Sequence, residues 1–248
     1  MFGFKNYVKA ASLDEAFELN QKKNNCLIGG MMWVRMGNKE YDTVIDISGL
    51  GLDGITETDD EFRIGAMVTL RELELNEALN ALSNGALKDA LCGIVGVQFR
   101  NMATVGGSIY GRYGFSDVLT FFMAFDTYVS LHKGGIMALA DYAKQKPDRD
   151  IVKEIIVKKA NVKAVTKSVR ISKTDFPVLC MTLCKANDEY TLSVGARPAR
   201  AAVLKSKDGN FDLESLTFGS NYRGSADYRK TVCTNLLKLA LKEINDGN

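Results

Sequence analysis

The most informative stretch of this sequence is Q-F-R-N-M-A-T-V-G-G-S-I, which occupies residues 98–109. Its glycine pair, Gly106 and Gly107, has no Cβ atoms, so backbone N–H groups there can approach a phosphate closely. A helical turn after the pair would add the positive end of its dipole. Because a single glycine pair is more often a simple turn, this stretch predicts a pyrophosphate site only in combination with a second segment of the same kind.

A second glycine pair lies in C-L-I-G-G-M-M-W-V, residues 26–34. The apolar residues 26–28 predict a short buried strand that runs into Gly29 and Gly30, and residues 31–36 follow as a helical turn. Neither pair belongs to a G-x-G-x-x-G pattern, and the chain contains no G-x-x-x-x-G-K-[ST]. The sequence therefore disfavours a Rossmann fold and a P-loop, and each glycine pair taken by itself is weak evidence for a phosphate site.

Capping residues and apolar periodicity predict helices and strands that alternate irregularly before residue 150. Ser12 with Glu15 forms a capping-box pattern, so we expect the chain to begin with a helix over 12–23. Thr69 with Glu72 opens another helix in the same way. The other expected elements are helices at 86–95 and 117–125 and strands at 43–47, 62–66 and 128–132.

The polar run around Pro147, residues 144–150, predicts a domain boundary. Strand-like segments dominate after it, Asn187 and Asp188 form a hairpin turn, and an amphipathic helix over 225–245 should cover one face of the resulting sheet. The expected strands are 151–157, 164–171, 178–186 and 190–196. The sequence thus predicts an α+β protein with domains at 1–150 and 151–248.

Composition excludes several classes of function. A net charge of +2 with acids and bases interspersed provides no field for a polyanion, so we expect no nucleic-acid partner. No apolar run approaches the roughly 20 residues of a membrane span, and residues 1–20 lack the apolar stretch of a signal peptide, so we expect a cytoplasmic protein without a membrane partner. The single histidine, His132, and the lack of paired carboxylates argue against hydrolysis.

The five cysteines form an odd set without a C-x-x-C pair. This pattern is typical of a reducing compartment and disfavours an iron–sulfur or zinc site within the chain. Cys180 and Cys184 lie four residues apart in an apolar run, so we expect both thiols to be buried on the same face of a strand.

Several segments together resemble the FAD domain of the flavoprotein subunits of xanthine dehydrogenase and carbon monoxide dehydrogenase. Residues 100–109, followed by Ser116-Asp117, are similar to the family's R-N-x-A-T-[VI]-G-G-N-I, and I-G-A-M-V-T-L at 64–70 is similar to its I-G-A-x-x-T-L. Near the C-terminus, R-G-S-A-D-Y-R at 223–229 resembles the family's R-G-S-x-x-Y-R, and G-A-R-P-A-R-A at 195–201 resembles its G-x-x-x-x-P-x-R-A, although both segments can serve packing alone. The resemblance covers nearly the whole chain.

This resemblance implies a fold and a set of cofactor contacts. The fold is a two-lobed FAD-binding domain of the PCMH type, with lobes at about 1–53 and 54–150, followed by a small C-terminal domain of an antiparallel sheet covered by helices. Asp117 would accept a hydrogen bond from FAD, and Ile94 and Ile156 would pack against it, although a buried isoleucine usually belongs to the core. The first loop would hold the pyrophosphate and the second would face it, through Leu27, Ile28, Gly29, Gly30, Met31, Met32, Trp33, Val34, Thr104, Val105, Gly106, Gly107 and Ser108. No residue of this chain is expected to be catalytic or to bind a metal.

The sequence departs from the family at several of these positions. Met31 and Met32 stand where the family has small polar residues, so amides remain but side-chain bonds to phosphate are lost. Ser108 replaces an asparagine, and Y-G-R-Y-G-F at 110–115 replaces a loop rich in alanine and proline, which leaves open whether a tyrosine lies beside the flavin or only on the surface. Since the one histidine falls in a predicted strand, FAD should be held noncovalently.

The function implied by the resemblance is electron transfer within a molybdenum hydroxylase. This chain would carry FAD, while a molybdenum-cofactor subunit and an iron–sulfur subunit would carry the other centres, and FAD would pass electrons to NAD or another acceptor. Two alternatives stay open. One is a stand-alone FAD-dependent reductase similar to UDP-N-acetylenolpyruvoylglucosamine reductase, and the other is a non-enzymatic scaffold that has lost FAD, which Met31 and Met32 make conceivable.

Overall fold

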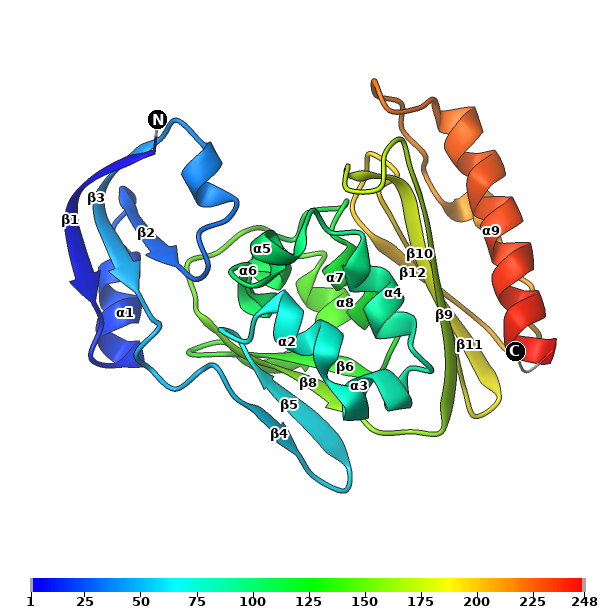
Figure 1. Cartoon of the computed structure of the whole chain (residues 1–248), viewed down its shortest axis with the longest axis horizontal. Helices are drawn as coiled ribbons and strands as arrows, with labels where there is room; N and C mark the ends of the chain where they lie inside the picture. Colours follow the sequence, from blue (N-terminus) through cyan, green and yellow to red (C-terminus); the bar gives the residue numbers. More distant parts are fainter. Residues whose placement is uncertain (1, 247–248) are drawn as a thin grey trace.

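The computed structural model describes residues 2–246 and arranges them as three sheets along the long axis of the molecule (Figure 1). The first is a parallel sheet of β1 (Gly3–Lys9), β3 (Glu40–Asp46) and β2 (Asn25–Ile28), in that order. Helix α1 (Leu13–Asn20) packs on it through Ala16 and its apolar neighbours. These elements form the N-terminal lobe.

Strand β1 precedes α1, so the expectation that the chain begins with a helix is wrong. Most side chains of β1 are exposed, because it is an edge strand held by backbone pairing to β3, and it therefore shows no apolar alternation. The predicted start of the helix itself is confirmed. The Ser12 hydroxyl accepts from the Glu15 amide at 3.1 Å, and the Glu15 carboxylate accepts from the Ala11 amide at 2.7 Å.

The second sheet is antiparallel, with the order β4-β5-β8-β6-β7. Its strands are β4 (Ile55–Glu57), β5 (Glu61–Gly65), β6 (Thr127–Leu131), β7 (Gly135–Ala138) and β8 (Val152–Lys158). Its helices, which share a buried apolar core with it, are α2 (Leu70–Leu75), α3 (Glu77–Leu82), α4 (Ala86–Cys92), α5 (Val97–Arg100), α6 (Val105–Tyr110), α7 (Asp117–Phe122) and α8 (Leu139–Tyr142). The predicted capping box at Thr69 and Glu72 is present at the start of α2.

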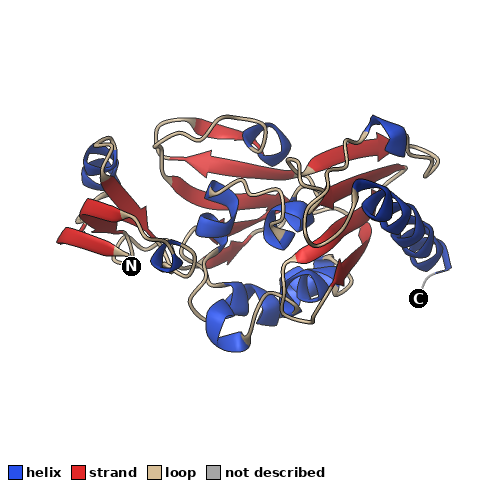
Figure 2. Ribbon diagram, turned by 90° about the horizontal axis from the view of Figure 1, so that it is seen from above, coloured by secondary structure: helices blue, strands red, loops and turns tan. Residues whose placement is uncertain are grey.

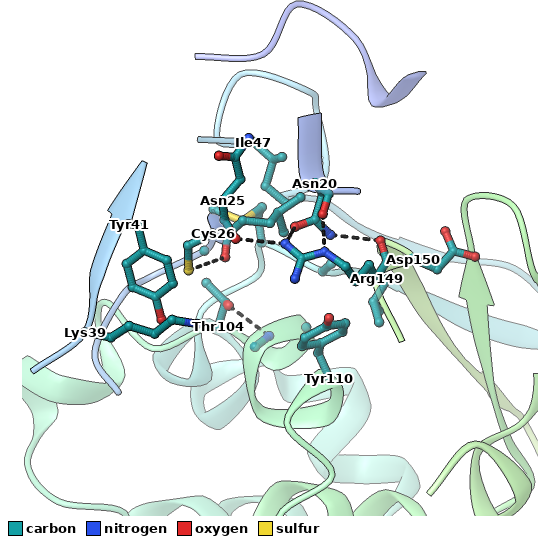
Figure 3. Close-up of a pocket in the computed structure, with 17 residues that line it drawn as sticks. Asn20, Asn25, Cys26, Lys39, Tyr41, Ile47, Thr104, Tyr110, Arg149 and Asp150 are labelled. Carbon is teal, nitrogen blue, oxygen red and sulfur yellow. Dashed lines mark hydrogen bonds between the residues drawn. The ribbon is translucent and has the colours of Figure 1, made fainter. Parts of the chain in front are cut away.

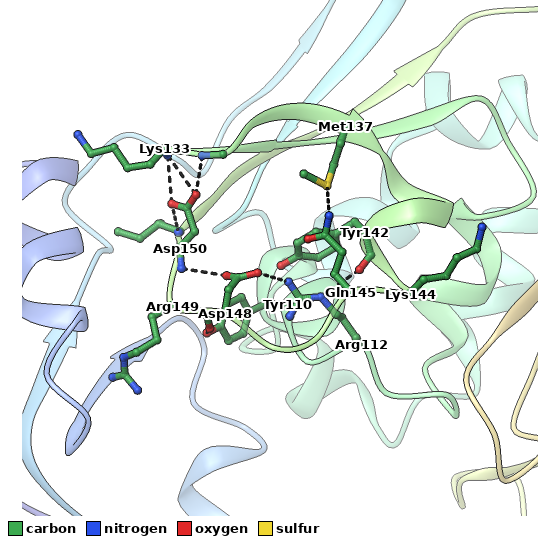
Figure 4. A network of polar contacts seen from close by, with 12 residues as sticks. Tyr110, Arg112, Lys133, Met137, Tyr142, Lys144, Gln145, Asp148, Arg149 and Asp150 are labelled. Carbon is green, nitrogen blue, oxygen red and sulfur yellow. Dashed lines mark hydrogen bonds and ion pairs between the residues drawn. The ribbon is translucent and has the colours of Figure 1, made fainter.

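Strand β8 pairs with β5 and β6 in the middle of this second sheet. A division at residue 150 would separate β8 from its sheet, whereas a division between β8 and the next strand keeps every sheet whole. The segment before β8 is also held in place by hydrogen bonds. Tyr110 donates to the Asp148 carbonyl at 2.5 Å, and Arg112 pairs with the Asp148 carboxylate at 2.6 Å. Figure 4 shows the pair of Arg112 and Asp148.

The third sheet is an antiparallel meander of β9 (Val162–Arg170), β10 (Pro177–Ala186), β11 (Glu189–Gly195) and β12 (Ala202–Ser206). The long helix α9 (Ala226–Asp246) covers one face, as Figure 2 shows, and α4 and α7 meet the other. Both faces are buried, which explains the unbroken apolar run of β10. The predicted burial of Cys180 and Cys184 is confirmed, and burial raises the pKa of both thiols, that of Cys184 to about 12.

Two short 3-10 turns complete the fold, η1 (Val34–Met36) after the first glycine pair and η2 (Leu213–Ser215) before α9. None of the helices within residues 2–246 combines the length and the apolar character that a membrane crossing needs.

Candidate functional site

The first glycine pair forms a loop whose backbone donors have no partner within the protein. Strand β2 ends at Ile28, and the loop runs from Gly29 to Trp33 before η1 begins. Within residues 2–246, none of the five amides from Gly29 to Trp33 donates a hydrogen bond. Met31 has a φ of 58°, a left-handed conformation of the kind that aims neighbouring N–H groups to one side. We call residues 29–33 the amide loop.

The second glycine pair has a different structure and lies in the first turn of α6. Thr104 caps this helix, and its Oγ1 accepts from the Gly107 amide at 3.2 Å. The amides of Val105 and Gly106 donate to the carbonyls of Val68 and Ala66, both at 2.9 Å, and the Ser108 amide donates to the Thr104 carbonyl at 3.1 Å. Since these donors are all engaged, the second segment can offer a ligand its surface but not its amides.

The missing Cβ atoms allow the two segments to touch each other. A Cβ at Gly30 would lie 1.5 Å from the carbonyl oxygen of Met102, and one at Gly29 would lie 2.8 Å from Thr104 Oγ1. Gly106 is equally constrained, because its Cβ would lie 2.6 Å from the Ala66 carbonyl oxygen. Three of the four glycines therefore serve close packing, and Gly107 is the least constrained, with Thr104 Oγ1 at 3.2 Å from an added Cβ.

A cavity of about 230 Å³ lies where the N-terminal lobe meets the second sheet (Figure 3). We call it the interlobe cavity. Gly29 lines it from one side, and Thr104, Gly106 and Gly107 line it from the other. Its other lining residues are both polar and apolar, and the polar ones are Asn20, Asn25, Cys26, Lys39, Tyr41, Tyr110, Arg149 and Asp150.

Arg149 joins the two walls of this cavity. Its guanidinium donates to the carbonyls of Lys22 and Asn25, at 2.9 and 2.8 Å, and also to the carbonyl of Asn20. Burial raises the pKa of Cys26 and of Tyr110, so both side chains are neutral near pH 7. Lys39 and Arg149 thus supply positive charge at the edge of the cavity next to the amide loop.

The residues expected at the site divide into three groups. Five of them line the interlobe cavity, namely Leu27, Gly29, Thr104, Gly106 and Gly107. Eight others belong to the same two segments without lining it, namely Ile28, Gly30, Met31, Met32, Trp33, Val34, Val105 and Ser108. Among these, Val105 is fully buried in the core, and the Ser108 hydroxyl donates to the Thr104 carbonyl at 2.9 Å.

The structure does not bring Asp117, Ile94 and Ile156 to this cavity. Asp117 is buried and pairs with Arg170 at 2.7 Å, and burial raises the pKa of its carboxyl. Ile94 packs against the core beside α4. Ile156 lies in β8, where its side chain points to the opposite face from its core neighbours Ile155 and Val157.

Several cavity residues escaped the sequence analysis. Lys39 and Tyr41 come shortly after η1, so their nearness in sequence to the amide loop was a signal that could have included them. Arg149 lay in the polar run that was interpreted as a domain boundary. Nothing in the sequence marks Asn20 or Asn25, because only tertiary contact brings them to the cavity.

Comparison with known proteins defines the class. The family described as FAD binding domain in molybdopterin dehydrogenase matches residues 2–162, and the chain belongs to this family. It is 32% identical over 139 residues to the xanthine dehydrogenase FAD-binding subunit of Escherichia coli O157:H7, covering 53% of this chain and 47% of that protein. It is 26% identical over 181 residues to the uncharacterized protein YgfM of Escherichia coli K12, covering 70% of this chain and 66% of that protein. The chain therefore spans about half the length of the xanthine dehydrogenase subunit.

Solved structures share the fold at low sequence identity. Quinoline 2-oxidoreductase from Pseudomonas putida 86 contains a chain with a TM-score of 0.83 and 14% identity, covering 100% of this chain and 98% of that one. Carbon monoxide dehydrogenase from Hydrogenophaga pseudoflava has a TM-score of 0.79 and 20% identity, covering 96% of both. These likenesses confirm the expected α+β fold.

The residues present fit the diphosphate of the FAD that the family implies. The amide loop presents five backbone N–H groups without partners among residues 2–246, and the oxygens of a diphosphate could accept hydrogen bonds from them. Gly107 faces the cavity without an obstructing side chain. The methionines of the loop do not oppose this, because Met32 is buried in the core of the second sheet and Met31 contributes its amide.

Proposed function

We propose that this chain binds FAD noncovalently and acts as the FAD-carrying electron-transfer subunit of a molybdenum hydroxylase. The amide loop is the observation that carries the proposal. A backbone N–H group without a partner in the protein has to be satisfied by water or by a ligand. A diphosphate held there would satisfy several of them at once.

The chain's own residues have distinct tasks in this proposal. The amide loop binds the diphosphate, and Lys39 adds positive charge beside it. Arg149 keeps the N-terminal lobe docked by donating to its carbonyls. Gly106 and Gly107 form the opposite wall of the interlobe cavity. FAD supplies the redox chemistry, since it exchanges electrons singly or in pairs.

The partners follow from the relatives. The bacterial relative is named a subunit of xanthine dehydrogenase, and one solved structure with this fold is a Cu,Mo-CO dehydrogenase. We therefore propose a molybdenum-cofactor subunit and an iron–sulfur subunit as partners, and NAD or another acceptor as the destination of the electrons. The five cysteines, all unpaired, support a reducing, cytoplasmic location.

The test begins with the purified chain. It should bind one FAD, release it on acid denaturation, and bind FMN much more weakly, because FMN lacks the diphosphate assigned to the amide loop. Equal affinity for FMN and FAD, or flavin that stays with the acid-precipitated protein, would contradict the proposal. Purification from the native source should also recover the two partner subunits, whereas an active chain without partners would favour a stand-alone reductase.

Gly107→Val tests the opposite wall. The nearest atom to the added Cβ is Thr104 Oγ1 at 3.2 Å, so the fold should survive, while the branched side chain occupies the cavity wall. FAD occupancy should fall. A folded variant that retains full FAD would show that this wall does not face the cofactor.

A further inference from the structure

The segment shortly before β8 is attached to three parts of the chain. It consists of Asp148, Arg149 and Asp150, and we call these residues the strap. Arg149 donates to carbonyls of the N-terminal lobe, and its own carbonyl accepts from the Asn20 side chain at 2.8 Å. The Asp150 carboxylate accepts from the amide of Gly134 at 2.7 Å, in the turn between β6 and β7. The strap therefore lies where the N-terminal lobe meets the second sheet.

Asp148 fastens the strap beside the end of α6. Its carboxylate accepts from the guanidinium of Arg112 at 2.6 Å, and its carbonyl accepts from the hydroxyl of Tyr110 at 2.5 Å. Figure 4 shows Asp148 turned toward Arg112 and Arg149 turned toward the N-terminal lobe. Tyr110 and Arg112 belong to Y-G-R-Y-G-F, the stretch in which this chain departs from the family loop. Two adjacent residues of the strap thus link that stretch to the N-terminal lobe.

The surroundings of Arg112 fix its position. Its side chain is only 4% exposed, its Nε donates to the Tyr142 carbonyl at 3.2 Å, and its guanidinium lies 3.8 Å from the centroid of the Tyr142 ring. Its φ of 47° is left-handed, a conformation that a residue other than glycine keeps only where neighbouring contacts hold it. Asp148 is the one carboxylate that pairs with it among residues 2–246. Because a buried guanidinium without a counterion is strongly destabilising, Arg112 in turn holds Asp148 in place.

The other ion pairs between the N-terminal lobe and the second sheet are more exposed. Asp14 in α1 pairs with Lys133 at 2.6 Å and with His132 at 2.9 Å, but its side chain is 68% exposed, so solvent screening leaves these pairs little strength. The strap is partly buried and continues into Ile151, which is 1% exposed and packs in the core of the N-terminal lobe. The strap is therefore the stronger polar attachment of this lobe.

We propose that Asp148 and Arg112 are positioning residues for the cofactor. They hold Arg149 where it docks the N-terminal lobe at the distance from α6 that the diphosphate needs. Neither of them lines the interlobe cavity, whereas Arg149 and Tyr110 do. This inference rests on the proposed function, since it takes FAD as the occupant of the cavity. A lobe that is already docked binds more tightly, because no part of the binding free energy is spent on docking it.

A double-mutant cycle on the dissociation constant of FAD tests whether Asp148 acts through Arg149. Asp148→Asn keeps the size of the side chain and removes its charge. It should weaken FAD about 10-fold in the intact chain, within the range over which members of one hydrogen-bond network couple. In the Arg149→Met background it should weaken FAD by less than about 2-fold, because the residue that it positions is already gone.

A merely structural role predicts a different result. General destabilisation would weaken FAD by the same factor in both backgrounds, and equal losses, or no loss in the intact chain, would overturn the proposal. Asp141→Asn is the matched control, because Asp141 makes an exposed pair with Lys144 in the same region and should leave FAD binding unchanged. If Asp148→Asn does not fold, the cycle is run with Arg112→Lys, which keeps the buried charge and should show a smaller loss with the same dependence on Arg149.

Hydrogen exchange in the ligand-free chain tests the docking without FAD. The amides of residues 20–25, whose carbonyls Arg149 holds, should exchange at least about 5-fold faster in Asp148→Asn, as in Arg149→Met, while α9 stays unchanged. Unchanged exchange at residues 20–25 in folded Asp148→Asn would overturn the proposal. Failure of the intact chain to bind FAD would overturn the proposed function instead, and the exchange rates would still decide whether Asp148 positions Arg149.

Discussion

The close approach of the two glycine segments gives a sharp prediction for Gly30→Ala. The added Cβ would lie 1.5 Å from the Met102 carbonyl oxygen, whereas real Cβ contacts do not fall below 3.0 Å. The segments must therefore separate by at least about 1.5 Å, and N–H···O bonds, which need roughly 2.7–3.2 Å, cannot survive such a shift at the neighbouring amides. Losing one hydrogen bond to a charged group costs about 1.5–3 kcal/mol, which corresponds to roughly 10- to 150-fold in affinity.

The assay measures two quantities on the same protein. The dissociation constant of FAD should rise at least about 10-fold, and the free energy of unfolding in urea should fall by the roughly 1–3 kcal/mol that overpacking costs. Gly54→Ala is the matched control, because no atom lies within 4 Å of its added Cβ, and it should change neither quantity appreciably. If Gly30→Ala binds FAD as the intact chain does, the amide loop does not hold the diphosphate.

Three further predictions concern stability and reactivity. Arg149→Met should lower the free energy of unfolding by about 2–3 kcal/mol, because three carbonyls of the N-terminal lobe lose their donor; an unchanged urea midpoint would mean that the lobe docks without Arg149. Arg170→Met should lower the free energy of unfolding by about 3–5 kcal/mol at pH 8, because it leaves Asp117 buried without a partner. Burial already raises the pKa of Asp117, so its carboxyl takes up a proton at a higher pH in the folded state than in the unfolded state. The stability of the variant should therefore recover as the pH falls from 8 towards 4. An equal loss of stability at both pH values would refute this. Cys92 is the one exposed cysteine, and burial raises the pKa of Cys233 to about 11 and of Cys184 to about 12, so one thiol should react rapidly with a thiol reagent at pH 8, and Cys92→Ser should remove that phase.

The sequence by itself determined the elements that are specified by local sequence patterns. The helices that begin at Ser12 and Thr69 were predictable because a capping side chain and its partner lie three residues apart, and the hairpin at Asn187 because asparagine tolerates the positive φ of 52° found there. The long apolar run of β10 and the amphipathic α9 were visible for the same reason. Strand β1 was not, because an edge strand is held by backbone bonds that leave no mark on its side chains.

The tertiary structure decided what the two glycine pairs do. From the sequence they were equivalent phosphate-binding segments. In the structure, the amides of the second segment donate to Thr104, Val68 and Ala66, and only those of the amide loop remain without partners among residues 2–246. Hydrogen-bond partners that lie dozens of residues away cannot be read from a local pattern. The same holds for Arg149, whose hydrogen bonds to the N-terminal lobe span more than a hundred residues of sequence. Sequence spacing specifies which groups a segment carries, and only packing specifies which of them are left free to bind.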